Sequence, residues 1–193
     1  MSDVEKRSNV KDNLITRVMP VIILLAIFWI VLIIDSIMTL SLTKYGIVPR
    51  TGMGLWGIIF SPFLHGGFGH LISNSLPFFF LASTAMIFYR KSTPKAMIFI
   101  ILVGGFLVWL FARSASHVGA SGLIFGLITF LMLSGIFRRD AKSILISIII
   151  LFSYGGSLII GVIPTQKGVS WEGHLFGGIA GILAAYIFRR KND

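Results

Sequence analysis

Long apolar runs, separated by short polar segments, make up most of the chain. Six of these runs are long enough, or nearly so, to cross a bilayer as helices, because about 20 apolar residues span its hydrocarbon core. The pattern therefore predicts an all-α membrane protein with six transmembrane helices. The predicted spans cover residues 20–42, 70–89, 96–111, 119–137, 143–163 and 171–188.

The 27 residues between the first two spans, 43–69, are too many for a simple turn. They are rich in Gly, Pro and aromatic side chains, which suits a compact structure that lies in the membrane interface rather than crossing the bilayer. We therefore expect a membrane-embedded first loop. Its aromatic residues are Trp56, Phe60, Phe63 and Phe68.

Composition supports the membrane assignment and excludes several other classes. Hydrophobic residues make up 55% of the chain and charged residues only 12%, whereas about a quarter of a soluble domain is charged. The net charge of +10 does not indicate a nucleic-acid partner, because the basic residues occur in short clusters between apolar runs. Without cysteine, the chain has no disulfide, thiolate metal site or cysteine nucleophile.

The Lys and Arg residues are divided unequally between the two sides of the predicted membrane. Thirteen lie on the side of the termini and four on the other, so the positive-inside rule places both termini in the cytoplasm. We therefore predict an N-terminal cytoplasmic tail (1–19), a six-helix domain (20–188) and a basic cytoplasmic tail (189–193). The thirteen are Lys6, Arg7, Lys11, Arg17, Arg90, Lys91, Lys95, Arg138, Arg139, Lys142, Arg189, Arg190 and Lys191, and the four are Lys44, Arg50, Arg113 and Lys167.

Three polar fragments stand at the outer ends of spans two, four and six: His70-Leu-Ile-Ser-Asn74, Gly119-Ala-Ser-Gly122 and Gly173-His174. Asn74, Ser121 and His174 precede the basic residue that follows each span by 16, 17 and 15 positions. At 1.5 Å per helical residue, all three lie roughly 22–26 Å from the cytoplasmic boundary, in one layer near the outer edge of the bilayer. Polar groups within a membrane are costly unless they are used, so this layer is the candidate functional site.

Ser121 is the candidate nucleophile of this layer. It lies in the first turn of its predicted helix, where the free N–H groups of Ala120, Ser121 and Gly122 can face a developing oxyanion. Considered alone, a serine in a membrane helix more often bonds to its own helix backbone. The neighbouring polar fragments favour the catalytic interpretation.

His174 is the candidate general base. Gly177 and Gly181 follow it on one helical face, and Gly122 and Gly126 offer a similar face on span four. Small residues let two membrane helices approach closely, which would bring the imidazole to the serine hydroxyl as a nucleophile–base pair requires. An isolated membrane histidine is otherwise more often a plain hydrogen-bonding residue.

His70 and Asn74 are four residues apart and share a face of span two. An amide or imidazole N–H that points at the serine would stabilise an oxyanion, although an interhelical hydrogen bond is the simpler alternative. Pro77 in the same span is expected to disturb its helix near Ser73 and to help open a water-accessible cavity.

The acidic residues predict a Ser-His dyad rather than a triad. Glu172 is two residues from His174 and therefore on the wrong helical face to orient the ring, so we expect an interfacial position for it. Asp35, the only acid in the interior of a span, is expected to bond to a nearby loop or helix. No cofactor or metal is expected, since His65 and His70 are five residues apart and no HExxH motif is present.

The order HxxxN, GxSG and then GHxxGGxxG resembles the rhomboid serine proteases, and His65, in a position where such proteases often carry histidine, adds to the likeness. The resemblance covers residues 45–185. It implies a six-helix bundle that cleaves transmembrane or membrane-adjacent segments of other proteins, with Ser121 as nucleophile and His174 as general base. It also implies that His70, Asn74 and the Ser121 amide form the oxyanion hole.

Further correspondences come from the same resemblance. Residues 43–69 match the membrane-embedded first loop, and span five with its following loop matches the proposed lateral gate. Phe125 stands where relatives commonly have a tyrosine packed on the catalytic histidine, so ring stacking is kept. The Trp-Arg pair typical of the first loop is absent, and the segment around Arg50 is the candidate replacement for its anchoring role.

Two other function classes remain open at this point. A non-catalytic rhomboid-like protein would bind client transmembrane helices in the same groove. A transporter or channel is disfavoured by the single acid in the interior of the spans and by the lack of matched broken helices. We expect transmembrane protein substrates, the lipid bilayer as environment and a bacterial plasma membrane as location, while the sequence does not define the oligomeric state.

Overall fold

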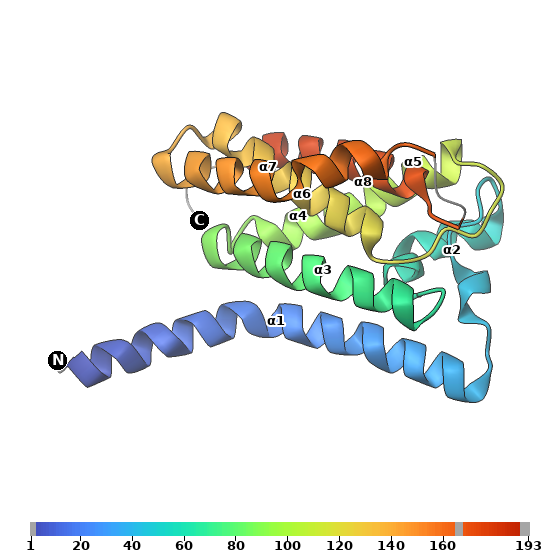
Figure 1. Ribbon diagram of the computed structural model, residues 1–193, viewed down its shortest axis with the longest axis horizontal. Coiled ribbons are helices and arrows are strands. Elements are labelled where there is room, and N and C mark those ends of the chain that lie inside the picture. Colours follow the sequence, from blue (N-terminus) through green and yellow to red (C-terminus); the bar gives the residue numbers. More distant parts are fainter. Residues whose placement is uncertain (1–2, 165–167, 190–193) are drawn as a thin grey trace.

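The computed structural model describes residues 3–164 and 168–189, so Lys167, Arg190 and Lys191 of the basic clusters lie outside the described residues. Its long helices run side by side along the longest dimension of the molecule, with α2 at one end (Figure 1). The elements are α1 (Asp3–Met38), η1 (Leu42–Tyr45), α2 (Gly52–Phe60), η2 (Ser61–Phe63), α3 (Phe68–Phe88), α4 (Thr93–Phe99), η3 (Ile100–Gly104), α5 (Gly105–Phe111), α6 (Ser121–Arg138), α7 (Ala141–Gly161) and α8 (Trp171–Ile187).

Five helices in the described part of the chain are long and apolar enough to cross a membrane. The chain is therefore a multi-pass membrane protein. They confirm the first five predicted spans, whereas α8, the sixth, has 17 residues and falls short of that length. The five stretches are Leu14–Met38, Phe68–Phe88, Thr93–Phe111, Ser121–Arg138 and Ala141–Gly161.

The first helix differs from the prediction at both ends. It begins at Asp3, so described residues of the predicted tail are helical and continue directly into the span. It ends at Met38, four residues earlier than expected, because Thr39 and Ser41 adopt left-handed φ angles of 49° and 57°. Asp35 Oδ1 accepts the Leu42 N–H at 2.9 Å across this turn, which confirms its predicted local role.

The third span is longer than the sequence predicted. It begins at Thr93 rather than at residue 96, and a π-helical turn, η3, joins α4 to α5. Gly104 lies in this turn, where an added Cβ would stand 3.3 Å from both Phe176 O and Gly177 Cα. The π-turn therefore packs closely against α8 near the middle of the bundle.

Helix α6 is the centre of the bundle and α7 its periphery. In the most apolar 18-residue stretch of α6, 67% of the residues are buried, compared with 11% in the corresponding stretch of α7. Glycines set the contact between α6 and α8: a Cβ at Gly177 would overlap the Gly122 carbonyl oxygen, and one at Gly181 would overlap that of Gly126. The predicted close approach of these two helices is confirmed.

The first loop is compact, as predicted, and is held against the C-terminal end of α5. Arg50 donates hydrogen bonds to the carbonyl oxygens of Leu110 (3.1 Å) and Ala112 (2.9 Å), and Trp109 Nε1 donates to Thr51 O at 2.8 Å. The Ile47 and His117 backbones pair as an antiparallel bridge. Arg50 therefore anchors this loop without the missing Trp-Arg pair.

The opposite end of the bundle is held by a buried arginine. Arg138 Nη2 donates to Ser92 Oγ at 3.0 Å and to Phe188 O at 2.9 Å, and its guanidinium lies 4.3 Å from the centre of the Tyr89 ring. These contacts tie the ends of α3, α6 and α8 together.

Candidate active site

One cavity of about 740 Å³ collects all four predicted site residues. His70 and Asn74 reach it from α3, Ser121 from α6 and His174 from α8. These four side chains, which come from three helices, therefore meet in one space. The cavity is also lined by Phe125 from α6 and by Tyr154 and Ser157 from α7.

Ser121 is the first residue of α6, so its N–H is free of intrahelical bonds. The chain enters the helix through Gly119, whose φ of 110° is a conformation that residues with a side chain rarely adopt. The Gly119 N–H donates to Ser61 O at 2.9 Å, which fixes this entry against η2. No hydrogen bond joins the Ser121 hydroxyl to His174 in the described structure, and such contacts are often loose in the absence of substrate.

The His174 imidazole is held on one edge and one face. Its Nδ1 lies 2.8 Å from the Gly161 carbonyl oxygen, and because a carbonyl can only accept, Nδ1 carries the proton. The neutral ring then has its lone pair on Nε2, the state that a general base requires. The Phe125 ring stacks on it with centroids 4.0 Å apart and planes 4° apart, which confirms the predicted stacking.

His70 has the complementary tautomer. The Gly66 N–H donates to His70 Nδ1 at 3.4 Å, so the neutral ring carries its proton on Nε2. A Cβ at Gly119 would lie 2.7 Å from this Nε2 and 3.5 Å from Asn74 Nδ2. Both donors therefore lie beside the turn that leads into Ser121.

Asn74 presents a buried donor without a partner among the described residues. The residue is 6% exposed, and its Nδ2 forms no hydrogen bond there. Burying an amide donor unpaired costs about 1–3 kcal/mol. An unpaired amide that lines the cavity beside Ser121 suits a group that is satisfied only when a ligand oxygen arrives.

His65 lies next to His70, which lines the cavity. Its ring is buried against Phe28 and lies 5.2 Å from the His70 ring. Burial, together with neighbouring His70, lowers the pKa of His65 to about 4, partly offset by the Phe63 backbone. No third His, Cys, Asp or Glu completes a metal-binding group in residues 3–164 and 168–189.

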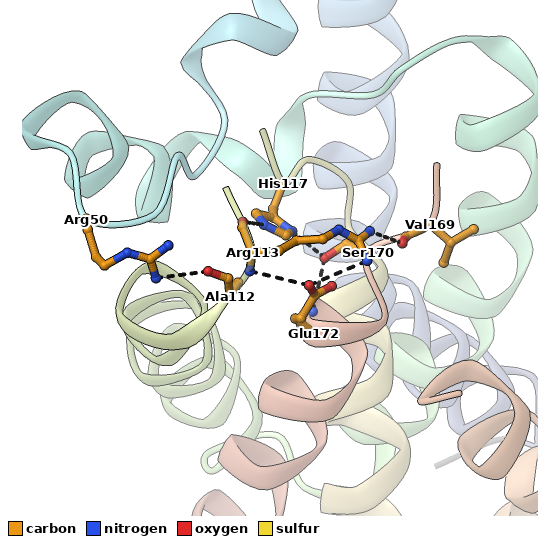
Figure 2. A network of polar contacts seen from close by, with 8 residues as sticks. Arg50, Ala112, Arg113, His117, Val169, Ser170 and Glu172 are labelled. Atoms are coloured by element: carbon orange, nitrogen blue, oxygen red, sulfur yellow. Dashed lines mark hydrogen bonds and ion pairs between the residues drawn. The ribbon is translucent and has the colours of Figure 1, made fainter. Parts of the chain in front are cut away.

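A polar network that the sequence analysis missed holds the start of α8 (Figure 2). His117 Nε2 donates to Arg113 O at 3.0 Å, and its Nδ1 accepts the Ser170 hydroxyl at 2.7 Å. Ser170 Oγ in turn caps α8 by accepting the Gly173 N–H at 3.1 Å. This arrangement fixes the turn that carries His174, and no local sequence signal pairs residues more than 50 positions apart.

The predicted interfacial position of Glu172 is wrong. Its side chain is 3% exposed and forms an ion pair with Arg113 at 3.5 Å, as Figure 2 shows. The helix turns it away from the cavity toward the α5–α6 connection, which the sequence could not place. Among the described residues, no carboxylate forms a hydrogen bond with His174.

Comparison with known proteins identifies relatives of the chain. The profile of the rhomboid domain family matches residues 52–191. The chain is 38% identical over 171 residues to "Uncharacterized protein Rv1337" of Mycobacterium tuberculosis. The aligned region covers 84% of this chain and 71% of that protein. It is 26% identical over 148 residues to "Putative rhomboid protease YdcA" of Bacillus subtilis, covering 72% of this chain and 69% of the relative.

A viral protein shows a comparable likeness. The chain is 29% identical over 133 residues to "Putative rhomboid protein L523" of Acanthamoeba polyphaga mimivirus, covering 65% of this chain and 71% of that protein.

Proposed function

Since this chain belongs to the rhomboid family, we propose that it is an intramembrane serine endopeptidase. Its substrates are transmembrane or membrane-adjacent segments of other membrane proteins. One observation carries the proposal: a single cavity holds a serine at a helix N-terminus, an imidazole with its lone pair on Nε2 and an unpaired buried amide donor.

The proposed reaction proceeds through an acyl-enzyme. Ser121 Oγ attacks the scissile carbonyl while His174 Nε2 takes its proton, and the same proton passes to the leaving amine when the peptide bond breaks. Water, activated by the neutral His174, then hydrolyses the ester and frees Ser121. A substrate helix must unwind locally first, because its backbone groups are already hydrogen-bonded.

The oxyanion of each tetrahedral intermediate needs donors that are already in place. Asn74 Nδ2, the Nε2–H of His70 and the Ser121 N–H supply three such donors on two helices. Donors fixed in a water-poor site stabilise developing charge without having to reorient.

The family membership and the distribution of basic residues support the membrane arrangement that we propose. We place α8 as the sixth span beside α6, both termini in the cytoplasm and the cavity toward the outer face of a bacterial plasma membrane. The 43–69 loop then lies in the outer interface, where exposed apolar side chains of α2 such as Trp56 and Met53 meet lipid.

Cleavage of a reconstituted transmembrane substrate tests the proposal. The wild-type chain should release two fragments, and Ser121→Ala should release none while its thermal unfolding in detergent stays nearly unchanged. Ser83→Ala is the control, because Ser83 is a buried serine of α3 that does not line the cavity. Persistent cleavage by Ser121→Ala would overturn the assignment.

A non-catalytic client-binding protein is the second candidate, and it is favoured by one observation: in the described part of the chain, Ser121 and His174 form no hydrogen bond with each other. This protein would capture a transmembrane helix in the same cavity without turning it over. Substrate binding without fragment release, and without reaction of Ser121 with a fluorophosphonate, would support it.

A further inference from the structure

The outer end of α7 contacts the catalytic base through a backbone group. Gly161 is the last residue of α7, so its carbonyl is among those left free by the helix. This carbonyl accepts the Nδ1–H of His174 at 2.8 Å. In serine hydrolases with a triad, a carboxylate occupies that position and selects the tautomer of the base.

The contact requires a glycine at this position. A Cβ at Gly161 would overlap the tip of the Phe125 ring and lie 3.2 Å from His174 Nδ1. The same ring stacks on the imidazole. Helix α7 therefore ends directly against both rings, with no space for a side chain between them.

The two halves of α7 are attached differently. Its first half is fixed to α6: Ser147 Oγ donates to Leu131 O and accepts the Gly135 N–H, both at 2.9 Å. Its buried residues, Ser143, Ile146 and Ile150, all lie in that half. The second half is largely exposed, with Phe152 at 85% and Ile159 at 68%.

We infer that the Gly161 carbonyl is the positioning group that takes the place of the missing acid. It holds His174 as the Nδ1–H tautomer, so that Nε2 is free to accept the Ser121 proton, and it does so only while the outer end of α7 is seated. Tyr154 and Ser157 of α7 line the same cavity. A displacement of this end of α7 therefore opens the cavity and at the same time breaks the hydrogen bond between Gly161 and His174. The inference rests on the proposed protease function.

Gly161→Ala tests the inference against Gly156→Ala, a control on the same helix at which an added Cβ meets nothing within 4 Å. Loss of a group that orients a metal-bound histidine typically costs about 10–100-fold in affinity or activity, and we take the same scale for His174. We therefore expect the rate at which a fluorophosphonate labels Ser121 to fall by about that factor in Gly161→Ala and to be unchanged in the control. Equal rates in the two variants would overturn the inference.

Nitrogen-15 NMR of histidine-labelled protein gives a readout that does not need activity. In a Ser121→Ala background, the His174 signals, identified by their loss in His174→Gln, should show a protonated Nδ1 and an unprotonated Nε2. Gly156→Ala should keep that spectrum, and Gly161→Ala should show a mixture of tautomers. An unchanged spectrum in Gly161→Ala would contradict the inference even if the wild-type chain proved inactive.

A backbone substitution removes the steric effect of the added methyl. Replacing Val162 by its α-hydroxy acid turns the Gly161 carbonyl into an ester carbonyl, a weaker acceptor, and adds no atom beside Phe125. The labelling rate should fall in the same direction as in Gly161→Ala, whereas the same replacement at Phe152, which is 85% exposed and does not line the cavity, should not lower it. A full rate with the ester at 162 would show that the carbonyl does not position the base.

Discussion

At the scale of single residues, the Asn74 amide is buried yet unpaired, so its removal should affect the reaction more than the fold. We predict that Asn74→Ala lowers kcat by about 10²–10³-fold with little change in KM, because the amide contacts the substrate oxygen mainly in the transition state. Its thermal unfolding should stay close to that of the wild type. Steady-state cleavage and unfolding in detergent measure both quantities, and a loss confined to stability would refute the oxyanion role.

His65 should make the stability of the fold depend on pH. Its folded-state pKa of about 4 lies below the ordinary histidine pKa of 6.5, so the unfolded chain binds a proton first as the pH falls. The free energy of unfolding should therefore decline between pH 6.5 and 4, by about 3 kcal/mol at most from this group. In His65→Gln, the fall in unfolding temperature from pH 7.5 to 5 should be smaller than in the wild type, and an equal fall would contradict this prediction.

The sequence could identify Ser121, His174, His70 and Asn74 because a polar side chain in an apolar run is conspicuous. It could not identify Gly161, whose role belongs to a backbone carbonyl that every residue possesses. The burial of Glu172 was equally hidden, since its partner Arg113 is 59 positions away in sequence. What sequence pattern misses is long-range pairing and backbone chemistry.

At the scale of elements, the contact between α6 and α8 makes a sharp prediction about two adjacent glycines. Gly177→Ala would place a methyl on the Gly122 carbonyl oxygen, whereas at Gly178 the nearest atom is Thr129 Cγ2 at an ordinary 3.6 Å. We expect Gly177→Ala to destabilise the fold by about 1–3 kcal/mol and to impair cleavage. Gly178→Ala should be tolerated or slightly stabilising, because alanine favours helix; equal unfolding temperatures for the two variants would refute this packing account.

The hydrophobic runs predicted the positions of the helices well, but they predicted the first and last residues of the helices less accurately. The start of α1 was missed because its first turns are polar, and the true end depends on left-handed residues and on the Asp35 cap. The earlier start of the third span follows from Pro94, which is favoured in a first helical turn. Hydropathy reports where a helix is apolar, whereas local backbone geometry decides where it ends.

At the scale of the whole molecule, the distribution of basic residues predicts which end faces the cytoplasm. The chain has no cysteine, so single cysteines can be introduced as unambiguous labels. In Lys44→Cys, within the first loop, a membrane-impermeant maleimide should label intact cells, whereas Lys91→Cys, between α3 and α4, should react only after permeabilisation. Both positions are solvent-exposed in the fold, and the reverse pattern would show that the orientation is inverted.

The central claim is that Ser121 is an activated nucleophile within the bundle. Intact-protein and peptide mass spectrometry after treatment with a fluorophosphonate tests it most directly. We predict one adduct, on Ser121. It should disappear in Ser121→Ala and be strongly reduced in His174→Ala, whereas Ser83→Ala should be labelled like the wild type. A folded wild-type chain that binds a transmembrane helix but carries no adduct on Ser121 would contradict it.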